Sequence, residues 1–278
     1  MHSNTQFNVS KIDWNDFKDY VFKKYAKSWA RTVYSYAKKY AELVDNPSIV
    51  ETFSGSKKNS VLKSLVALSK FYGFYPEFKQ RIEDYGIKYS RTSSIDSFFR
   101  IFNNNNKNIL VWYQKAANVL NDVCSTYLKF LVMSGLRPSE GIESFNLIRT
   151  RLEEYYNVEF GILEHFRFKD TFLRNTKNVF ITIIPEALIQ EIAEKEKVTY
   201  PMVTKKLQRN GLHIKLNNLR DYYATFMVRH GLIKEEVDLL QGRIGKSIFV
   251  RHYWSPAIKE LKQRVIKALN ELEKTILS

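Results

Sequence analysis

Apolar residues recur at helical spacing along most of this chain, and this pattern limits its possible folds more than any other feature. Residues 10–89 follow it throughout, and it returns on both sides of one β-like stretch. In that stretch, GILEHFRFKD (161–170) and NVFITIIP (178–185) are rich in β-branched and aromatic residues, and TFLRNTK between them is a hairpin turn region. We therefore expect a mostly α fold with a small antiparallel β-sheet.

The helical pattern is interrupted at YGIKYSRTSS (85–94), where polar and small residues gather. We interpret this segment as an interdomain linker. At 278 residues, the chain is long enough for two domains that each have a core of their own. The sequence predicts a helical domain over residues 1–89 and a second domain over residues 90–278.

The chain is strongly basic, with 44 Lys and Arg residues against 29 Asp and Glu residues and a formal net charge of +15. Such an excess favours a polyanionic partner, which is nucleic acid or an acidic membrane surface. No run approaches the roughly 18 apolar residues of a membrane-spanning helix, and residues 1–14 lack the apolar part of a signal peptide. We expect a cytoplasmic protein that does not bind a membrane.

The sequence offers few ligands for a cofactor. Cys124 is the only cysteine, which excludes an internal disulfide and a multi-cysteine zinc site. The five histidines show no metal-binding spacing, and there is no glycine-rich phosphate loop. We therefore expect chemistry that needs no metal, no nucleotide and no other cofactor.

Residues 219–253 carry the densest group of candidate functional residues. LRDYYATFMVRHGL has helical apolar spacing with a stop at Gly231, and IKEEVDLLQG forms a second short helix that stops at Gly242. A basic turn and the sequence RHYW follow. Two successive helices on a basic chain are also typical of a helix-turn-helix motif, in which Arg220 is only a surface charge. The local pattern leaves both interpretations open.

The same stretch resembles the C-terminal half of the tyrosine recombinase (phage-type integrase) family. There the pattern is H-x-L-R-H, then a helical stretch to G-H or G-W, then a nucleophilic tyrosine. This chain has N-N-L-R-D at 217–221, G-R at 242–243, and Tyr253. Asn217, a candidate supporting residue, stands where histidine is commonest, and Arg243 stands where histidine or tryptophan is usual. Basic replacements of this kind resemble integrases of archaeal viruses and plasmids.

The upstream motifs of the family also have counterparts here, in family order. GLRPSE resembles the first motif, which implies that Arg137 is the first catalytic arginine and Glu140 an acidic supporting residue. Local physics alone predicts that one helix ends and another begins at this junction. The family places a mobile lysine in the hairpin, where Lys177 is our choice and Lys169 and Arg174 are competitors.

The resemblance implies DNA cleavage and rejoining through a 3′-phosphotyrosine. Tyr253 is the implied nucleophile. Arg137 and Arg220 are expected to grip the nonbridging phosphate oxygens, because a planar guanidinium matches phosphate and keeps its charge. Lys177 is expected to protonate the leaving 5′ oxygen, and Arg243 to add a further phosphate contact.

The resemblance also implies a role for each domain. Residues 1–89 would clamp DNA, and residues 90–278 would form the catalytic domain. We expect a site-specific recombinase, the integrase of a mobile element, that acts on double-stranded attachment sites as a homotetramer in the host cytoplasm, associated with the nucleoid. The alternatives are a type IB topoisomerase and a noncatalytic DNA-binding regulator in which Tyr253 is inert. The apolar stripe of residues 256–278 fits a helix packed on its own domain or on a neighbouring subunit.

Overall fold

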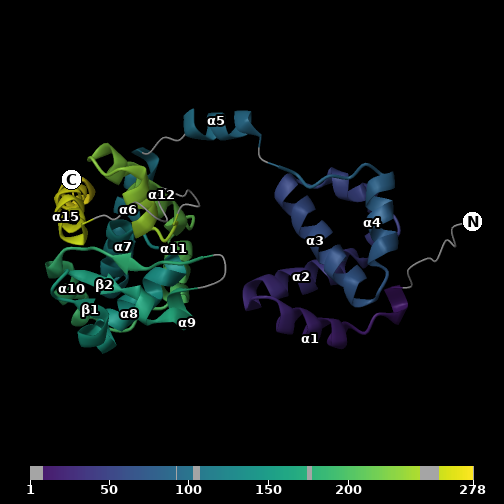
Figure 1. Cartoon of the computed structure of the whole chain (residues 1–278), viewed down its shortest axis with the longest axis horizontal. Helices are drawn as coiled ribbons and strands as arrows, with labels where there is room; N and C mark the ends of the chain where they lie inside the picture. Colours follow the sequence, from purple (N-terminus) through teal and green to yellow (C-terminus); the bar gives the residue numbers. More distant parts are fainter. Residues whose placement is uncertain (1–8, 92, 103–106, 174–176, 245–256, 278) are drawn as a thin grey trace, which may run out of the picture. The chain divides into compact units, whose positions relative to one another are not determined.

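The computed structural model describes residues 9–91, 93–102, 107–173, 177–244 and 257–277 (Figure 1). The chain forms two compact units, Met1–Asn103 (unit 1) and Asn104–Ser278 (unit 2). Helices dominate both units, and the described strands form a three-stranded antiparallel sheet in unit 2. The predicted mostly α fold with a small antiparallel sheet is therefore confirmed. The functional boundary between residues 89 and 90 stays a prediction.

Unit 1 is a small helical assembly around a core of its own. The faces of its first helices meet around buried side chains that include Phe17, Val33, Leu65 and Phe78. The helix α3 packs against α2, α1 and α4. Its elements are η1 (Val9–Lys11), α1 (Trp14–Lys24), α2 (Lys27–Tyr40), η2 (Ala41–Val44), η3 (Pro47–Thr52), α3 (Gly55–Phe71), α4 (Tyr75–Asp84) and α5 (Ser94–Phe102).

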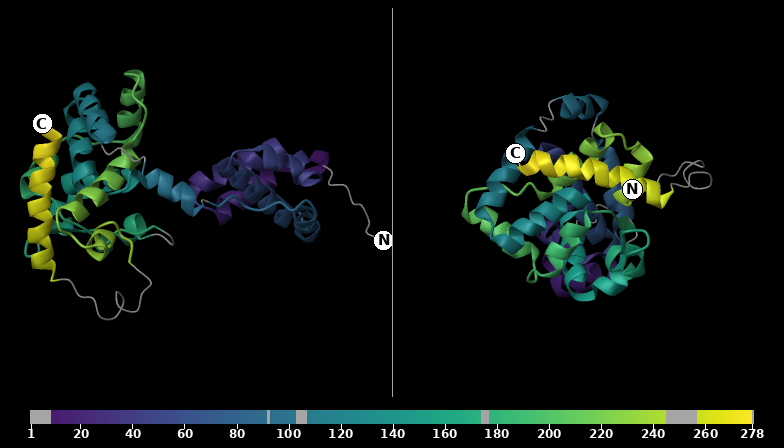
Figure 2. Two further views of the ribbon diagram at one scale, coloured as in Figure 1. Left: turned by 90° about the horizontal axis from the view of Figure 1, so that it is seen from above. Right: turned by 90° about the vertical axis from the view of Figure 1, so that its left-hand side faces the viewer.

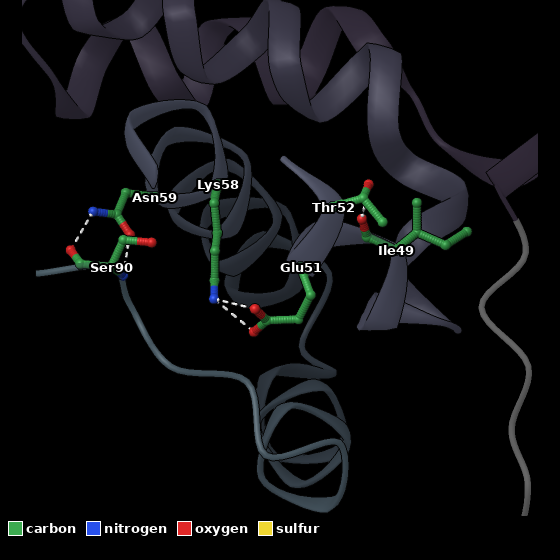
Figure 3. A network of polar contacts seen from close by, with 6 residues as sticks. All are labelled: Ile49, Glu51, Thr52, Lys58, Asn59 and Ser90. Carbon is green, nitrogen blue, oxygen red and sulfur yellow. Dashed lines mark hydrogen bonds and ion pairs between the residues drawn. The ribbon is translucent and has the colours of Figure 1, made fainter. Parts of the chain in front are cut away.

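A polar network ties the first turns of α3 to two neighbouring segments (Figure 3). Lys58 Nζ donates to both carboxylate oxygens of Glu51, at 2.6 Å each. The side-chain amide of Asn59 donates to the carbonyl of Ser90 and accepts from its N–H, both at 2.8 Å. Because this amide pairs with the backbone as a neighbouring strand would, it holds the chain beyond α4 against α3. Unit 1 thus makes its own contacts as far as Ser90.

Unit 2 is organised around the helix α7 (Asp122–Ser134). Nearly every side of α7 is buried, and its buried side chains include Tyr127, Leu128, Phe130 and Leu131. A helix that is apolar all round needs neighbours all round, and α6, α8, α10, α12 and α15 supply them. Among the described residues, the helices of unit 2 are α6 (Lys107–Val119), α7, α8 (Pro138–Tyr155), η4 (His165–Arg167), α9 (Lys169–Phe172), α10 (Glu186–Ala193), α11 (Tyr200–Arg209), α12 (Leu216–Arg229), α13 (Lys234–Leu240) and α15 (Ile258–Leu277).

The C-terminal helix α15 covers one face of unit 2 (yellow in Figure 2). It buries a stripe against α6, α7 and α12, with Leu261, Val265, Leu269, Leu272 and Ile276 turned inward. This arrangement is the first of the two predicted alternatives, a helix packed on its own domain. None of the helices in the described ranges is both long enough and apolar enough to cross a membrane.

The sheet is short and is held to α8 by a buried polar network. Strand β2 (Ile162–Glu164) lies between β1 (Tyr156–Asn157) and β3 (Ile181–Thr182), with Leu163 opposite both Tyr156 and Thr182. His165, just after β2, contacts the hydroxyl of Tyr155 through Nδ1 at 2.6 Å and that of Thr182 through Nε2 at 2.7 Å. Burial lowers the pKa of His165 to about 3. A neutral imidazole therefore joins the end of α8 to β3.

Candidate active site

The junction between α7 and α8 places Arg137 and Glu140. Helix α7 ends at Gly135, whose φ of +62° favours glycine, and the ring of Tyr223 lies 2.3 Å from where a Cβ would be. Glu140 in the first turn of α8 accepts from Arg137 N at 3.1 Å and from Arg137 Nη1 at 2.7 Å. The Glu140 carboxylate is almost fully buried, whereas the Arg137 side chain keeps 21% of its surface exposed. The ion pair thus fixes Arg137 while leaving part of its side chain accessible.

Arg220 on α12 is the most buried of the predicted arginines, with 4% of its surface exposed. Its guanidinium donates to the carbonyl of Gly135 through Nη1 at 2.7 Å and to that of Gln241 through Nη2 at 2.6 Å. Burial, and then the charges of Arg137 and Arg243, lower the pKa of Arg220 to about 10, so it stays protonated at neutral pH. A guanidinium carries five N–H donors, so donors remain for a ligand after these two bonds.

The turn after α13 brings Arg243 to the same place. Gly242 has a φ of +67°, and a Cβ there would come within 1.8 Å of the carbonyl oxygen of Asn178. Arg243 N donates to Asp238 O at 2.6 Å, and its guanidinium lies 3.9 Å from the Asp238 carboxylate. The Arg243 side chain is 52% exposed. The glycine therefore permits a backbone contact that seats this turn against the hairpin region.

The segment that contains Lys177 lies beside both arginine junctions. The carbonyl of Asn178 accepts a long, 3.5 Å hydrogen bond from Arg137 Nη1 and also contacts Gly242. Asn178 pairs with Leu173 in an isolated antiparallel bridge, as expected for a hairpin. Lys177, immediately before Asn178, is exposed. The backbone next to Lys177 is thus part of the cluster, and the choice of Lys177 as the functional lysine stays a prediction.

Lys169 and Arg174 are the alternatives to Lys177 as the functional basic residue of the hairpin region. Lys169 is exposed on the short helix α9. Arg174 lies outside the described residues. The structure therefore gives a backbone link to the arginine cluster for Lys177, through Asn178.

Asn217 and Tyr253 are the remaining predicted site residues. Asn217 is exposed in the first turn of α12, three residues before Arg220 and so on the same face of that helix. Tyr253, the predicted nucleophile, lies outside the described residues. Tyr222 and Tyr223 are buried, and burial raises the pKa of both hydroxyls. Both side chains pack in the hydrophobic core of unit 2.

Taken together, three elements far apart in the sequence bring their basic side chains to one cluster. Arg137, Arg220 and Arg243 interact electrostatically, and Glu140 is the buried counter-charge. A group of guanidinium ions with free donors suits the oxygens of a phosphate. Within the described ranges, no group of His, Cys, Asp and Glu side chains could hold a metal ion.

Sequence reasoning missed Gln241. It is fully buried, and its side chain and backbone both bond to Arg220. A signal was available, because Val237, Leu240 and Gln241 have the spacing of one helical face. An amide at the end of an apolar face is a position where a buried partner should be sought.

The sequence also matches a known protein family. A family model described as archaeal phage integrase matches residues 101–263, which is more than half of the chain. The chain therefore belongs to the archaeal phage integrase family. This confirms the resemblance to phage-type integrases, supports site-specific DNA integration as its general activity, and implies that it binds DNA. A search among curated proteins found no significant match.

Proposed function

We propose that this chain is a tyrosine-type site-specific recombinase that cuts and rejoins DNA through a 3′-phosphotyrosine. The observation that carries the proposal is the convergence of Arg137, Arg220 and Arg243, with Glu140 buried beneath them. Three guanidinium ions suit a phosphodiester that gains negative charge in the transition state. In this role they replace the metal ions that other phosphoryl-transfer enzymes use.

Each residue then has a defined part in the reaction. The phenolic oxygen of Tyr253 attacks the scissile phosphorus and forms a bond to it, while the bond from phosphorus to the 5′ oxygen breaks. The phosphorus stays bonded to the 3′ oxygen, which gives the 3′-phosphotyrosine. Arg137 and Arg220 hold the nonbridging oxygens. Lys177 gives a proton to the leaving 5′ oxygen, and the reverse attack of that oxygen reseals DNA. The phenol of Tyr253, whose ordinary pKa is about 10, loses its proton to solvent as its oxygen attacks the phosphorus.

The supporting residues orient this group. Glu140 fixes Arg137 through the bonds to its backbone N–H and Nη1, and so acts by orientation alone. Arg243 supplies a further phosphate contact from the turn after α13. Asn217, on the same face of α12 as Arg220, is the proposed supporting contact to a phosphate or sugar oxygen.

The proposed partners are double-stranded attachment sites of a mobile element and its host, bound by four copies of the chain during recombination. Unit 1 supplies DNA binding through its exposed lysines, because phosphate contacts account for most nonspecific affinity. The proposed place of action is the cytoplasm of the host, on its DNA. No cofactor takes part in the proposed reaction.

The test is a trapping experiment with nicked duplexes that carry a randomised central segment. A nick just 3′ of the cleaved phosphate lets the short fragment that carries the free 5′-hydroxyl diffuse away, so the covalent protein–DNA adduct accumulates. We expect wild-type protein to form adducts in the presence of EDTA and Tyr253→Phe to bind the same DNA without forming them. Adducts that form equally on all sequences, with relaxation of supercoiled plasmid, indicate a type IB topoisomerase. DNA binding without adducts in the wild type indicates a noncatalytic regulator.

A further inference from the structure

Gln241 contacts both the side chain and the backbone of Arg220. The guanidinium of Arg220 donates to the backbone carbonyl of Gln241 at 2.6 Å, and the side-chain amide of Gln241 donates back to the backbone carbonyl of Arg220 at 2.9 Å. Gln241 is fully buried. The two residues therefore form a closed pair that links α12 to the turn after α13.

Stability alone does not explain an amide at this position. The Oε1 atom of Gln241 is buried and has no hydrogen-bond partner. A buried acceptor without a partner is unfavourable compared with an apolar side chain of the same shape. The carbonyl of Arg220 lies inside α12, so it can also accept the regular helical bond and does not depend on Gln241. A buried acceptor that lacks a partner beside a candidate active site therefore indicates a functional role for the residue that carries it.

Asn146, another residue of unit 2 with a side-chain amide, differs from Gln241 in the use of its carbonyl oxygen. Asn146 on α8 donates to the carbonyl of Val198 at 2.9 Å and accepts from its N–H at 3.2 Å. Both polar groups of Asn146 are therefore used, and its partner lies in the connection before α11. Asn146 is thus a structural counterpart of Gln241 that does not contact Arg220.

Gln241 lies at the start of the turn after α13, so its position affects both Arg220 and Arg243. One of the two carbonyls that hold the guanidinium of Arg220 belongs to Gln241 itself, and that carbonyl is fixed only if the turn after α13 is fixed. Backbone bonds hold this turn to α13, and the side-chain bond of Gln241 ties it to α12. Gly242 and Arg243 follow directly, so the same bond also links the position of Arg243 to that of Arg220.

We propose that Gln241 is a positioning residue: its side-chain amide holds the turn that grips the guanidinium of Arg220 and carries Arg243. This inference rests on the proposed function, because the position of Arg220 matters for rate only if Arg220 holds the reacting phosphate. Displacement of a reacting group by about 1 Å can cost about 100-fold in rate. The expected signature is a lower cleavage rate on fully bound DNA, with little change in DNA affinity.

The experiment compares Gln241→Met with Asn146→Leu. Each change replaces an amide with an apolar side chain of similar shape and removes its hydrogen bonds. Single-turnover adduct formation is followed on a nicked substrate selected with the wild-type protein, at saturating protein and well below the unfolding temperature of each variant. DNA affinity is measured separately on the same duplex. The predicted result is a cleavage rate lowered by about tenfold or more for Gln241→Met, with affinity within about twofold, and a wild-type rate for Asn146→Leu.

Other outcomes reject the inference in distinguishable ways. A wild-type cleavage rate for Gln241→Met, or an equal loss for Asn146→Leu, shows that the amide has no special relation to Arg220. Gln241→Leu serves as a second apolar variant, and failure of both to fold shows a structural role instead. If the wild-type protein itself forms no adduct, the proposed function fails first. That result is separate from one in which the wild type cleaves and Gln241→Met cleaves equally well.

Discussion

The two units present their basic side chains in opposite ways. In unit 1 most lysines lie at the surface, although Lys58 is buried against Glu51. Several rest over aromatic rings, such as Lys57 Nζ at 3.9 Å from the ring centroid of Phe53 and 5.4 Å from that of Tyr40. In unit 2, Arg220 is almost fully buried and is held by two backbone carbonyls. Long lysine side chains keep rotamer freedom, whereas Arg220 has one defined direction.

This difference separates two tasks that a DNA enzyme must perform. Surface charges raise affinity for the phosphate backbone without fixing any one phosphate. Burying a guanidinium is unfavourable unless its donors find partners, and the carbonyls of Gly135 and Gln241 are such partners for Arg220. The surface lysines of unit 1 should therefore control binding, and the arginine cluster around the buried Arg220 in unit 2 should control the cleavage rate.

The largest effect is expected at the buried guanidinium. Arg220→Lys keeps the positive charge, but one ammonium cannot span two carbonyls and also bind phosphate in a fixed direction. We predict an adduct-forming rate lowered by about 100- to 1,000-fold at saturating DNA. Arg229→Lys, an exposed change on the same helix, should stay within about twofold of the wild type. Equal losses in the two variants would show that burial does not set the role of Arg220.

The glycine that ends α7 gives the next largest effect. In Gly135→Ala, the new Cβ would lie 2.3 Å from the ring of Tyr223 at a φ of +62°, so both overlap and strain destabilise unit 2, by about 3 kcal/mol. Gly211→Ala is the matched control, because Gly211 has a φ of +70° with no atom near its Cβ position. It should cost about 1 kcal/mol. Chemical denaturation would measure both, and similar losses would mean that the Tyr223 contact contributes nothing.

Acid should weaken unit 2 through His165. Burial lowers its folded-state pKa to about 3 from an ordinary value of 6.5, so below pH 6.5 the unfolded chain takes up a proton that the folded chain does not. Stability is thus fully present above pH 6.5 and falls with decreasing pH, by at most about 1.4 kcal/mol per pH unit from this group.

Hydrogen exchange of peptides from residues 138–182 at pH 7 and pH 5 would measure this loss. His165→Gln should reduce the difference between the two pH values, whereas His213→Gln, a change at an exposed position, should leave it unchanged. An unchanged pH dependence in His165→Gln would mean that other groups cause it.

The smallest effect is expected in unit 1. Lys57→Gln should weaken DNA binding several-fold and reduce the slope of log affinity against log salt by about 1, with no change in cleavage rate at saturation. Lys79→Gln removes the same charge, but Lys79 lies 3.4 Å from Glu83 and should change the slope less. Fluorescence anisotropy at several salt concentrations would compare the two. A slower cleavage rate for Lys57→Gln on saturating DNA would contradict the separation of tasks.

The elements that position the site were predictable where local physics determines them. Gly231 and Gly242 both have positive φ and follow the ends of α12 and α13, as the helix-stop pattern predicted. The junction around Gly135 was predicted for the same reason. Capping by glycine depends on a few neighbouring residues, so a sequence pattern is enough to find it.

Features that depend on contacts between distant segments were not predictable in this way. The carbonyl of Asn178 contacts Gly242 and lies at the limit of hydrogen-bond distance from Arg137, but nothing in the hairpin sequence specifies these partners. The role of Gln241 likewise depends on α12 lying next to the turn after α13. Hydrogen bonds to backbone carbonyls leave no residue-type signature at the accepting position. They therefore become visible only in the folded chain.

The most direct test of the account is to identify the peptide that carries DNA. Wild-type adduct trapped on a nicked duplex would be treated with nuclease and trypsin and analysed by mass spectrometry. The account predicts a nucleotide on the tryptic peptide HYWSPAIK (252–259), which contains Tyr253 and no other tyrosine. A nucleotide on DYYATFMVR (221–229), which contains the buried Tyr222 and Tyr223, would contradict it.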